Sequence, residues 1–279
     1  MKKLNRIIFF VIVMSICLIS ILSNKVYAVE NTINEIKIEV NIKEDGIAEI
    51  TETWNVEMYG ISELYKPYYG LNISQIENFT VIDETNNRYE YVPDWDIDAT
   101  REEKANKCGI YVNKEQGETD ICWGVQKDGK HTYILKYNIT NFIKQNMGYQ
   151  TVNFKFLQSN MDPLPKKISV IVESENQFKE KEVIATGYGY EGEAKIENGK
   201  AIFKAEEGLN TDDYMTIELE FNNNVFPLSD EDRTVDAYQN DGILAKSHVS
   251  KYTIYAVIVF ILIIVILVVD MYRKKKKVK

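Results

Sequence analysis

Hydrophobic and polar residues alternate along most of the chain from residue 33 to residue 221, a period of two that is typical of β-strands with one buried face. The clearest example is residues 36–42, where isoleucine or valine occupies every second position. The turn sequence Glu44-Asp45-Gly46 follows, and the alternation resumes from Ala48 to Met58. These two segments predict a β-hairpin.

The same alternation recurs in four later segments, His131–Ile139, Val152–Phe156, Ile168–Val172 and Met215–Phe221. Asn198-Gly199, which lies between apolar residues 196 and 202, is the strongest two-residue signal for a further hairpin. About a dozen short strands predict an all-β fold, an antiparallel β-sandwich ectodomain that forms either one large or two small sandwiches. Residues 98–106 are expected to form one short helix or a polar loop.

The first 28 residues have the three parts of a secretory signal peptide. Lys2, Lys3 and Arg6 precede an apolar run of 16 residues at positions 7–22, and Val26-Tyr27-Ala28 offers a cleavage site after Ala28. An uncleaved signal anchor is the alternative, because 16 residues is long for the apolar part of a signal peptide.

A second apolar run, residues 252–269, contains 18 residues without a charge and is followed by the cations of Arg273–Lys277. Such a run is long enough to cross a bilayer, and the positive-inside rule then puts the basic tail in the cytoplasm. The expected organisation is a signal peptide (1–28), an extracellular β-sandwich domain (29–222), a polar stalk (223–251), a single transmembrane helix (252–272) and a basic cytoplasmic tail (273–279). The protein is therefore expected in the cell membrane, with the β-domain outside.

Charge divides the chain in the same way. The formal net charge of the whole chain is −9, but residues 29–251 contain 23 basic and 41 acidic residues and carry −18. A segment this acidic is not suited to binding nucleic acid, which needs clustered cations. The expected partners are the membrane bilayer and an envelope polymer or another surface protein.

Two short motifs resemble elements of a known family. They are Gly129-Lys130-His131-Thr132-Tyr133-Ile134-Leu135-Lys136-Tyr137 and an opening strand that continues into Asp45-Gly46 and Ile50-Thr51-Glu52. Together with the strands at 152–156 and 168–172, and more weakly residues 209–213, they resemble in their order the extracellular N-terminal domain of predicted bacterial membrane proteins grouped as domain of unknown function 2207. The resemblance covers about residues 33–226. It implies a secreted, membrane-tethered β-domain and no catalytic residue, because the family has no established activity.

Cys108 and Cys122 are the two cysteines of the segment between the apolar ends. Each lies in a strand-like stretch, and Gly117 supplies a turn between them. A hairpin would bring them opposite each other and allow a disulfide in an extracellular domain. The alternative is two free, half-buried thiols, since another register would separate them.

Two further motifs are weak candidates for binding. Asp94-Trp95-Asp96-Ile97-Asp98 places carboxylates at alternate positions, as in a calcium loop, although an EF-hand is excluded because Ala99 and Ala105 stand where glycine and glutamate are required. An irregular calcium site using Asp94, Asp96 and Asp98 competes with a polar loop in which Trp95 and Ile97 pack inward. Tyr65, Tyr68 and Tyr69 surround a proline, and on a rigid loop they would suit a sugar ring or a peptide. The alternative is a turn whose rings cover the end of the sandwich.

Glu52 falls on the same strand face as Ile50 and Trp54, which predicts a carboxylate on the apolar side. Burial would raise the pKa of that carboxyl group and suit it to catalysis. The favoured interpretation is an edge position or a hydrogen bond to a tyrosine or lysine, because no second acid or base is placed beside it. His131, at the start of another apolar face, is expected to be a strand-end histidine with satisfied hydrogen bonds.

The expected function is that of a non-enzymatic binding or interaction module at the cell surface, with no cofactor apart from calcium at the acidic loop. One alternative is a cell-envelope hydrolase that uses acid pairs among Glu52, Asp94, Asp96 and Asp98. The other is an accessory subunit of a membrane complex that acts through its transmembrane helix.

Overall fold

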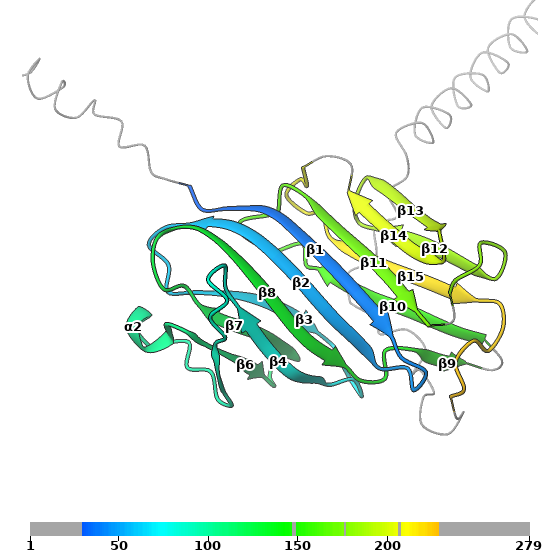
Figure 1. Ribbon diagram of the computed structural model, residues 1–279, viewed down its shortest axis with the longest axis horizontal. Helices are drawn as coiled ribbons and strands as arrows, with labels where there is room; N and C mark the ends of the chain where they lie inside the picture. Colours follow the sequence, from blue (N-terminus) through cyan, green and yellow to red (C-terminus); the bar gives the residue numbers. More distant parts are fainter. Residues whose placement is uncertain (1–29, 147–148, 176, 206–207, 229–279) are drawn as a thin grey trace, which may run out of the picture. The chain divides into compact units, whose positions relative to one another are not determined.

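The computed structural model describes residues 30–146, 149–175, 177–205 and 208–228. These residues form fifteen strands and one short helix (Figure 1). The helix among these residues is not long and apolar enough to span a membrane. The predicted signal peptide, transmembrane helix and basic tail, and the stalk from residue 229 onward, lie outside the described residues.

The largest sheet has seven strands in the order β13-β14-β11-β1-β2-β8-β4 (Figure 1). Their bounds are β1 Thr32–Ile42, β2 Ala48–Met58, β4 Ile76–Ile82, β8 Gly129–Ile139, β11 Ile168–Ser174, β13 Gly192–Glu197 and β14 Lys200–Ala205. The predicted β1–β2 hairpin is confirmed, with Val40 opposite Ile50. However, β1 also pairs with β11 in parallel, so the sheet is mixed and not purely antiparallel.

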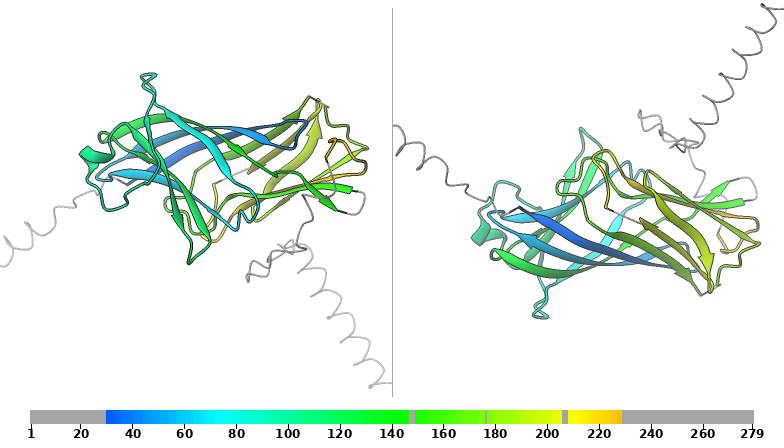
Figure 2. Two further views of the ribbon diagram at one scale, coloured as in Figure 1. Left: turned by 90° about the horizontal axis from the view of Figure 1, so that it is seen from below. Right: turned by 90° about the horizontal axis from the view of Figure 1, so that it is seen from above.

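Two four-stranded sheets face the seven-stranded sheet across the core (Figure 2). The first has the order β3-β7-β6-β5, with β3 Glu63–Tyr69, β5 Glu90–Val92, β6 Lys107–Asn113 and β7 Glu118–Gly124. The second has the order β12-β15-β10-β9, with β9 Lys144–Asn146, β10 Tyr149–Leu157, β12 Val183–Tyr188 and β15 Met215–Phe221. The fold is therefore a two-layered β-sandwich in which one layer consists of two sheets.

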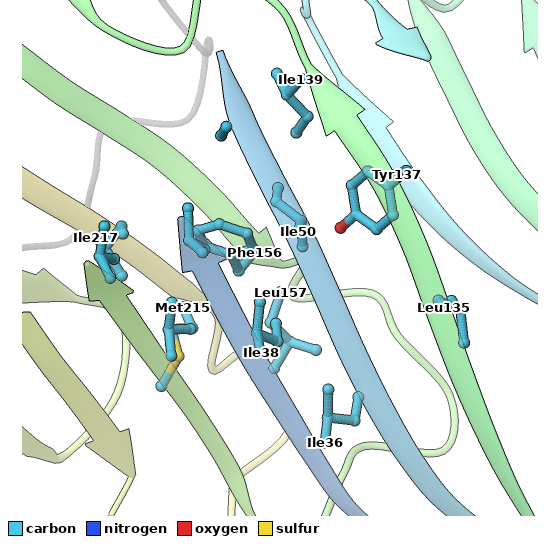
Figure 3. Close-up of a cluster of buried hydrophobic side chains, with 14 of the residues drawn as sticks. Ile36, Ile38, Ile50, Leu135, Tyr137, Ile139, Phe156, Leu157, Met215 and Ile217 are labelled. Atoms are coloured by element: carbon cyan, nitrogen blue, oxygen red, sulfur yellow. The ribbon is translucent and has the colours of Figure 1, made fainter. Parts of the chain in front are cut away.

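A single hydrophobic core joins the three sheets. Figure 3 shows its central part, where isoleucine and leucine side chains of β1, β2 and β8 lie near side chains of β10 and the segment around Met215 and Ile217. Phe154 of β10 lies 5.7 Å from Tyr68 of β3, between ring centroids, so aromatic rings connect the two smaller sheets. Of the two sandwich arrangements considered from the sequence, the structure has one large sandwich.

Two features at the margins refine the predicted boundaries. The segment expected as a short helix or polar loop contains helix α2, Arg101–Lys104, whose start is fixed by a capping box between Thr100 and Glu103.

Phe226, which the sequence pattern assigns to the stalk, is buried against Phe221. Gln150 accepts hydrogen bonds from the backbone N–H groups of residues 225 and 226. The folded domain thus continues at least to Phe226.

Candidate functional site

The carboxylate of Glu52 lies in the middle of the core. Strand β2 pairs with β1 on one side and with β8 on the other, so Glu52 is on a central strand and not at an edge. Its side chain points the same way as Ile50 and Trp54 and is fully buried. The predicted orientation of Glu52 is therefore confirmed.

Four side chains from three strands donate hydrogen bonds to Glu52. Trp54 Nε1 donates to Oε2 at 2.7 Å, and Lys66 Nζ lies 2.5 Å from Oε1 as a buried ion pair. The hydroxyl groups of Tyr68, at 3.3 Å, and of Tyr137 donate to the same Oε1 atom. The interpretation of Glu52 as a carboxylate bonded to tyrosine and lysine is confirmed.

Burial controls the protonation of this network. It lowers the pKa of the Lys66 ammonium group, although the charge of Glu52 partly opposes this effect. Burial, and then the negative charge of Glu52, raise the pKa of the Tyr68 and Tyr137 hydroxyl groups well above the usual value. The phenols are therefore neutral donors. The Lys66 ammonium group also lies 5.4 Å from the centroid of the Phe156 ring, so it contacts an aromatic ring as well as the Glu52 carboxylate.

The three aspartates proposed for calcium do not converge. Asp94, Asp96 and Asp98 are exposed, and the Asp96 side chain accepts a hydrogen bond from the backbone N–H of Asp98 at 2.9 Å. Within the described parts of the chain, no group of three or more His, Cys, Asp or Glu side chains is placed to hold a metal ion. Trp95 is buried as expected, but Ile97 is half exposed and does not pack inward.

The three candidate tyrosines lie on strand β3 and not in a loop. Pro67 is tolerated because β3 is at the edge of its sheet, where a missing backbone N–H costs no ladder bond. Alternation along the strand then separates the tyrosines. Tyr68 points into the core and binds Glu52, whereas Tyr65 and Tyr69 point outward and are 55% and 38% exposed.

The outward side of the β3-β7-β6 part of this sheet gathers aromatic and acidic side chains. We call it the tyrosine–acid face and define it by Tyr65, Pro67, Tyr69, Tyr111, Glu118 and Asp120. In the strand register, Asp120 of β7 lies between Pro67 of β3 and Tyr111 of β6. Tyr69 donates a hydrogen bond to Glu118 at 2.6 Å.

Asp120 is the residue of this face that the sequence analysis missed. Its side chain is only 8% exposed, and its Oδ1 atom is buried without a hydrogen-bond partner. Burial, and then the charges of Glu118 and Glu63, raise the pKa of the Asp120 carboxyl group to about 7. The sequence could have indicated Asp120 only through the alternation of Asp120, Ile121 and Cys122. Both faces of β7 are buried, so this alternation did not show on which face of the sheet Asp120 lies.

The predicted disulfide between Cys108 and Cys122 is absent, and both cysteines are free and buried. Strands β6 and β7 do form the expected hairpin, but Cys108 lies opposite Trp123, and Cys122 lies opposite Gly109. Successive side chains of a strand point to opposite faces, so this register puts the two thiols on opposite sides of the sheet. Burial raises the pKa of Cys108 to about 11 and also raises that of Cys122.

The segment that contains helix α2 covers one end of the same outward side. Lys104 forms an ion pair with Glu63 at 3.2 Å, and Trp95 Nε1 donates to Glu63 at 2.5 Å. The segment lies so close that a Cβ atom at Gly124 would be 2.0 Å from the carbonyl oxygen of Lys104. The tyrosine–acid face begins where this cover ends.

An open hollow of about 510 Å³ lies at the tip of the β6–β7 hairpin, on the opposite side of the sheet from the tyrosine–acid face, because Ile110 and Val112 alternate with Tyr111 along β6. Ile76, Ile110 and Val112 contribute apolar side chains to its lining, and Lys114 and Glu118 contribute charged ones. The hollow and the tyrosine–acid face are therefore separate surfaces that meet only at the hairpin tip, near Glu118.

His131 is not available as a ligand. Its Nδ1 atom lies 3.1 Å from Glu84 Oε1, and its Nε2 atom lies 2.8 Å from the carbonyl oxygen of Lys127. The prediction of a strand-end histidine with satisfied hydrogen bonds is confirmed.

The fold and these sites define an all-β domain of the two-layered sandwich class, with a sealed polar network inside and a tyrosine–acid face outside. The chain belongs to the family described as predicted membrane protein (DUF2207) N-terminal domain, whose model matches residues 32–221. The resemblance found in the sequence is therefore confirmed, and the chain is a member of a membrane-protein family. A comparison with curated proteins finds none that matches.

Two of the solved structures that match share a remote likeness with this chain. Native yeast LTA4 hydrolase is 10% identical with a TM-score of 0.40, over 69% of this chain and 29% of the hydrolase. An M1 zinc metallopeptidase from Deinococcus radiodurans is 10% identical with a TM-score of 0.35, over 68% of this chain and 42% of the peptidase. This chain thus spans less than half the length of either enzyme.

Proposed function

We propose that this protein is a binding module of the cell surface, held in the membrane by a single-pass C-terminal helix with the β-domain outside and the basic tail in the cytoplasm. Its ligand, an envelope polymer or a surface molecule, is held by the tyrosine–acid face. The observation that carries the proposal is Asp120, a buried carboxyl group with an unpartnered oxygen, among two exposed tyrosines. Rigid aromatic rings around a desolvated polar group are typical of binding sites.

The position of these tyrosines on a paired strand supports the same function. Tyr65 and Tyr69 project from β3, whose backbone is fixed by its pairing with β7. Side chains presented by a sheet lose less conformational freedom on binding than side chains of a mobile loop.

A cell-envelope hydrolase has less support from the geometry. Its candidate acids were Glu52 and the aspartates of residues 94–98, and two carboxyl groups about 5–9 Å apart in an open cleft are required. Glu52 is sealed between the sheets by Lys66 and Tyr68. The three aspartates are exposed, on the segment whose Trp95 bonds to Glu63 on the outward side of the β3-β7-β6 sheet. These groups do not share a cleft.

The proposal is tested with the full chain in lipid nanodiscs and washed, protease-treated cell envelopes of the producing organism. Binding is measured by co-sedimentation at increasing envelope concentration. The double variant Tyr65→Ala/Tyr69→Ala is expected to bind at least about tenfold more weakly than the unmodified chain, since it loses both exposed rings.

The matched control is Tyr188→Ala. Tyr188 is also a partly exposed strand tyrosine that donates to a glutamate, Glu218, but it lies in the β12-β15 sheet. Unchanged binding by this control supports the proposal. Equal binding by the double variant and the unmodified chain would overturn it, and so would the same loss in the control.

A further inference from the structure

Asp120 contains a buried oxygen atom that no group in the described parts of the chain satisfies. Folded proteins satisfy nearly all their buried polar atoms, because an oxygen that loses water without gaining a donor raises the free energy of the folded state. A hydrogen-bond donor that arrives from outside the chain would remove this cost. Asp120 is therefore a candidate to bind a donor group of a ligand.

The charged groups that face Asp120 make a positively charged donor the best match. Glu118 precedes it on the same side of β7, and Glu63 lies at the start of the neighbouring strand β3. Lys104, a cation at this side of the sheet, is held by Glu63 and by the carbonyl oxygen of Ile97 at 2.6 Å. The field at Asp120 is thus negative.

The uncharged titratable groups around Asp120 are also suited to a cation. Tyr65 and Tyr69 of β3, Tyr111 of β6 and Cys122 of β7 occupy the same side of the sheet. Burial raises the pKa of Cys122, Tyr65 and Tyr69, so all three are neutral near pH 7. Phenol rings attract cations placed over their faces.

We propose that the tyrosine–acid face binds a primary ammonium group, with Asp120 as the receiving carboxylate and Tyr65 and Tyr69 as the flanking rings. This inference rests on the proposed function and specifies the chemistry of its ligand. In the strand register Asp120 lies opposite Pro67, between Tyr65 and Tyr69, and these two tyrosines are reached from solvent because they are 55% and 38% exposed.

Size and access distinguish ammonium from other cations. A guanidinium group is a broad planar fork that is best held when both oxygens of a carboxylate are open to it, whereas an ammonium group is a compact charge that can reach the nearly buried Asp120. A calcium ion requires about six or more oxygen ligands. The described chain provides no cluster of three acidic, histidine or cysteine side chains that could begin such a site. A carboxyl group that is only 8% exposed and lies beside aromatic rings therefore fits ammonium best.

Binding of the ammonium group is coupled to loss of a proton from Asp120. In the free protein this carboxyl group has a pKa of about 7 and is therefore partly protonated at neutral pH. The bound ammonium group favours the carboxylate, so the proton leaves to solvent as the ligand binds. Affinity should then increase as the pH rises through the pKa of Asp120.

The test uses isothermal titration calorimetry on the full chain in nanodiscs at low ionic strength. The probe is N-acetyl-lysine methylamide, and the reference probe is the same compound acetylated on its side-chain amine. The charged probe is expected to bind at least about tenfold more tightly than the neutral one, and its affinity should be about tenfold higher at pH 8 than at pH 6. Asp120→Asn should remove both effects, because the amide keeps the shape of the side chain without its charge.

The control variant is Glu115→Gln, which removes an exposed acid from the turn between β6 and β7 and leaves Asp120 in place. It should keep both effects. Equal binding of the two probes, or unchanged binding in Asp120→Asn, would overturn the inference. If that occurs while envelope binding still depends on Tyr65 and Tyr69, the ligand is of another chemistry and the proposed function stands. If envelope binding is also independent of the tyrosines, both proposals fail.

Discussion

Glu52 and Asp120 are both buried carboxyl groups, but their surroundings are opposite. Glu52 receives hydrogen bonds from Trp54, Lys66 and two tyrosines, and a cation balances its charge. Asp120 has an unpartnered oxygen and acidic neighbours. A satisfied buried carboxylate specifies how the sheets fit together, whereas an unsatisfied one is a reason to look for a ligand.

The Lys66–Glu52 pair gives a stability prediction. Lys66→Met should lower the free energy of unfolding by about 3–5 kcal/mol, because it leaves the Glu52 charge buried without its cation. The double variant Lys66→Met/Glu52→Gln should recover part of this loss, since no charge then remains unpaired. The measurement is urea unfolding of the full chain followed by tryptophan fluorescence.

Lys37→Met serves as the control for this prediction. Lys37 pairs with Glu35 on the surface, where its side chain is 58% exposed, so its loss should change stability by less than about 0.5 kcal/mol. If Lys66→Met behaved like this control, the pair would not be buried as the structure has it. If the double variant were less stable than Lys66→Met, the unpaired charge would not be the cause.

How far single residues were predictable depended on their strand. The direction of Glu52 followed from the alternation of β2, where every other residue of the same face is apolar. The hydrogen-bond partners of Glu52 could not be predicted from this pattern. Lys66 and Tyr68 come from another sheet, and Tyr137 comes from β8, which pairs with β2 but lies far from it in the sequence. Asp120 was missed because β7 is buried on both faces, which removes the contrast between inward and outward positions.

At the scale of elements, the β6–β7 hairpin shows that a sequence pattern can predict two paired strands without predicting their register. The strands and their turn were predictable from Cys108, Gly117 and Cys122, but the register was not. A shift of one residue in pairing moves a side chain to the other face. The disulfide prediction failed for this reason, although the hairpin itself is correct.

The segment of residues 93–105, which covers one end of the outward side of the β3-β7-β6 sheet, gives a prediction about its own packing. Gly124→Ala should displace the segment of residues 93–105, since the new Cβ atom would lie 2.0 Å from the carbonyl oxygen of Lys104. The overpacking should cost about 1–3 kcal/mol. Hydrogen exchange measured by mass spectrometry should accelerate in residues 93–105 and much less in β15.

Gly208→Ala is the matched control, because no atom lies within 4 Å of the position of its Cβ atom. It should leave exchange in residues 93–105 unchanged. Normal exchange in that segment of the Gly124→Ala variant would show that the cover is not packed on Gly124.

At the scale of the whole domain, the sequence predicted the class of fold but not its layers. Alternation identified strands such as β1, β2, β8 and β11 and their buried faces, because burial of one face is a local property of a strand, whereas β3 was expected to be a loop or turn. The division into sheets of seven, four and four strands depends on contacts between distant segments such as β1 and β11. Those contacts leave no local pattern, so both the single sandwich and its parallel pairing emerged only from the structure.

The shared core predicts that the described domain unfolds as one unit. Phe154→Ala should lower its stability by about 2–4 kcal/mol, because this half-buried ring connects Tyr68 of β3 with Phe142 and Phe156. Hydrogen exchange should accelerate equally in β7 and β15, which lie in different sheets. Acceleration in β15 alone would indicate two independent units, and Ile184→Ala, at a half-exposed position, should alter neither strand.

The parallel pairing of β1 with β11 also has a consequence for the order of events during synthesis. The first strand of the domain can join β2 as soon as the hairpin is made, but its other edge stays open until residues 168–174 emerge. Throughout that interval the nascent chain presents an unpaired edge and an apolar face of isoleucines. Vectorial folding therefore cannot complete the large sheet from its beginning, and a chain that pauses before β11 is the species most exposed to aggregation.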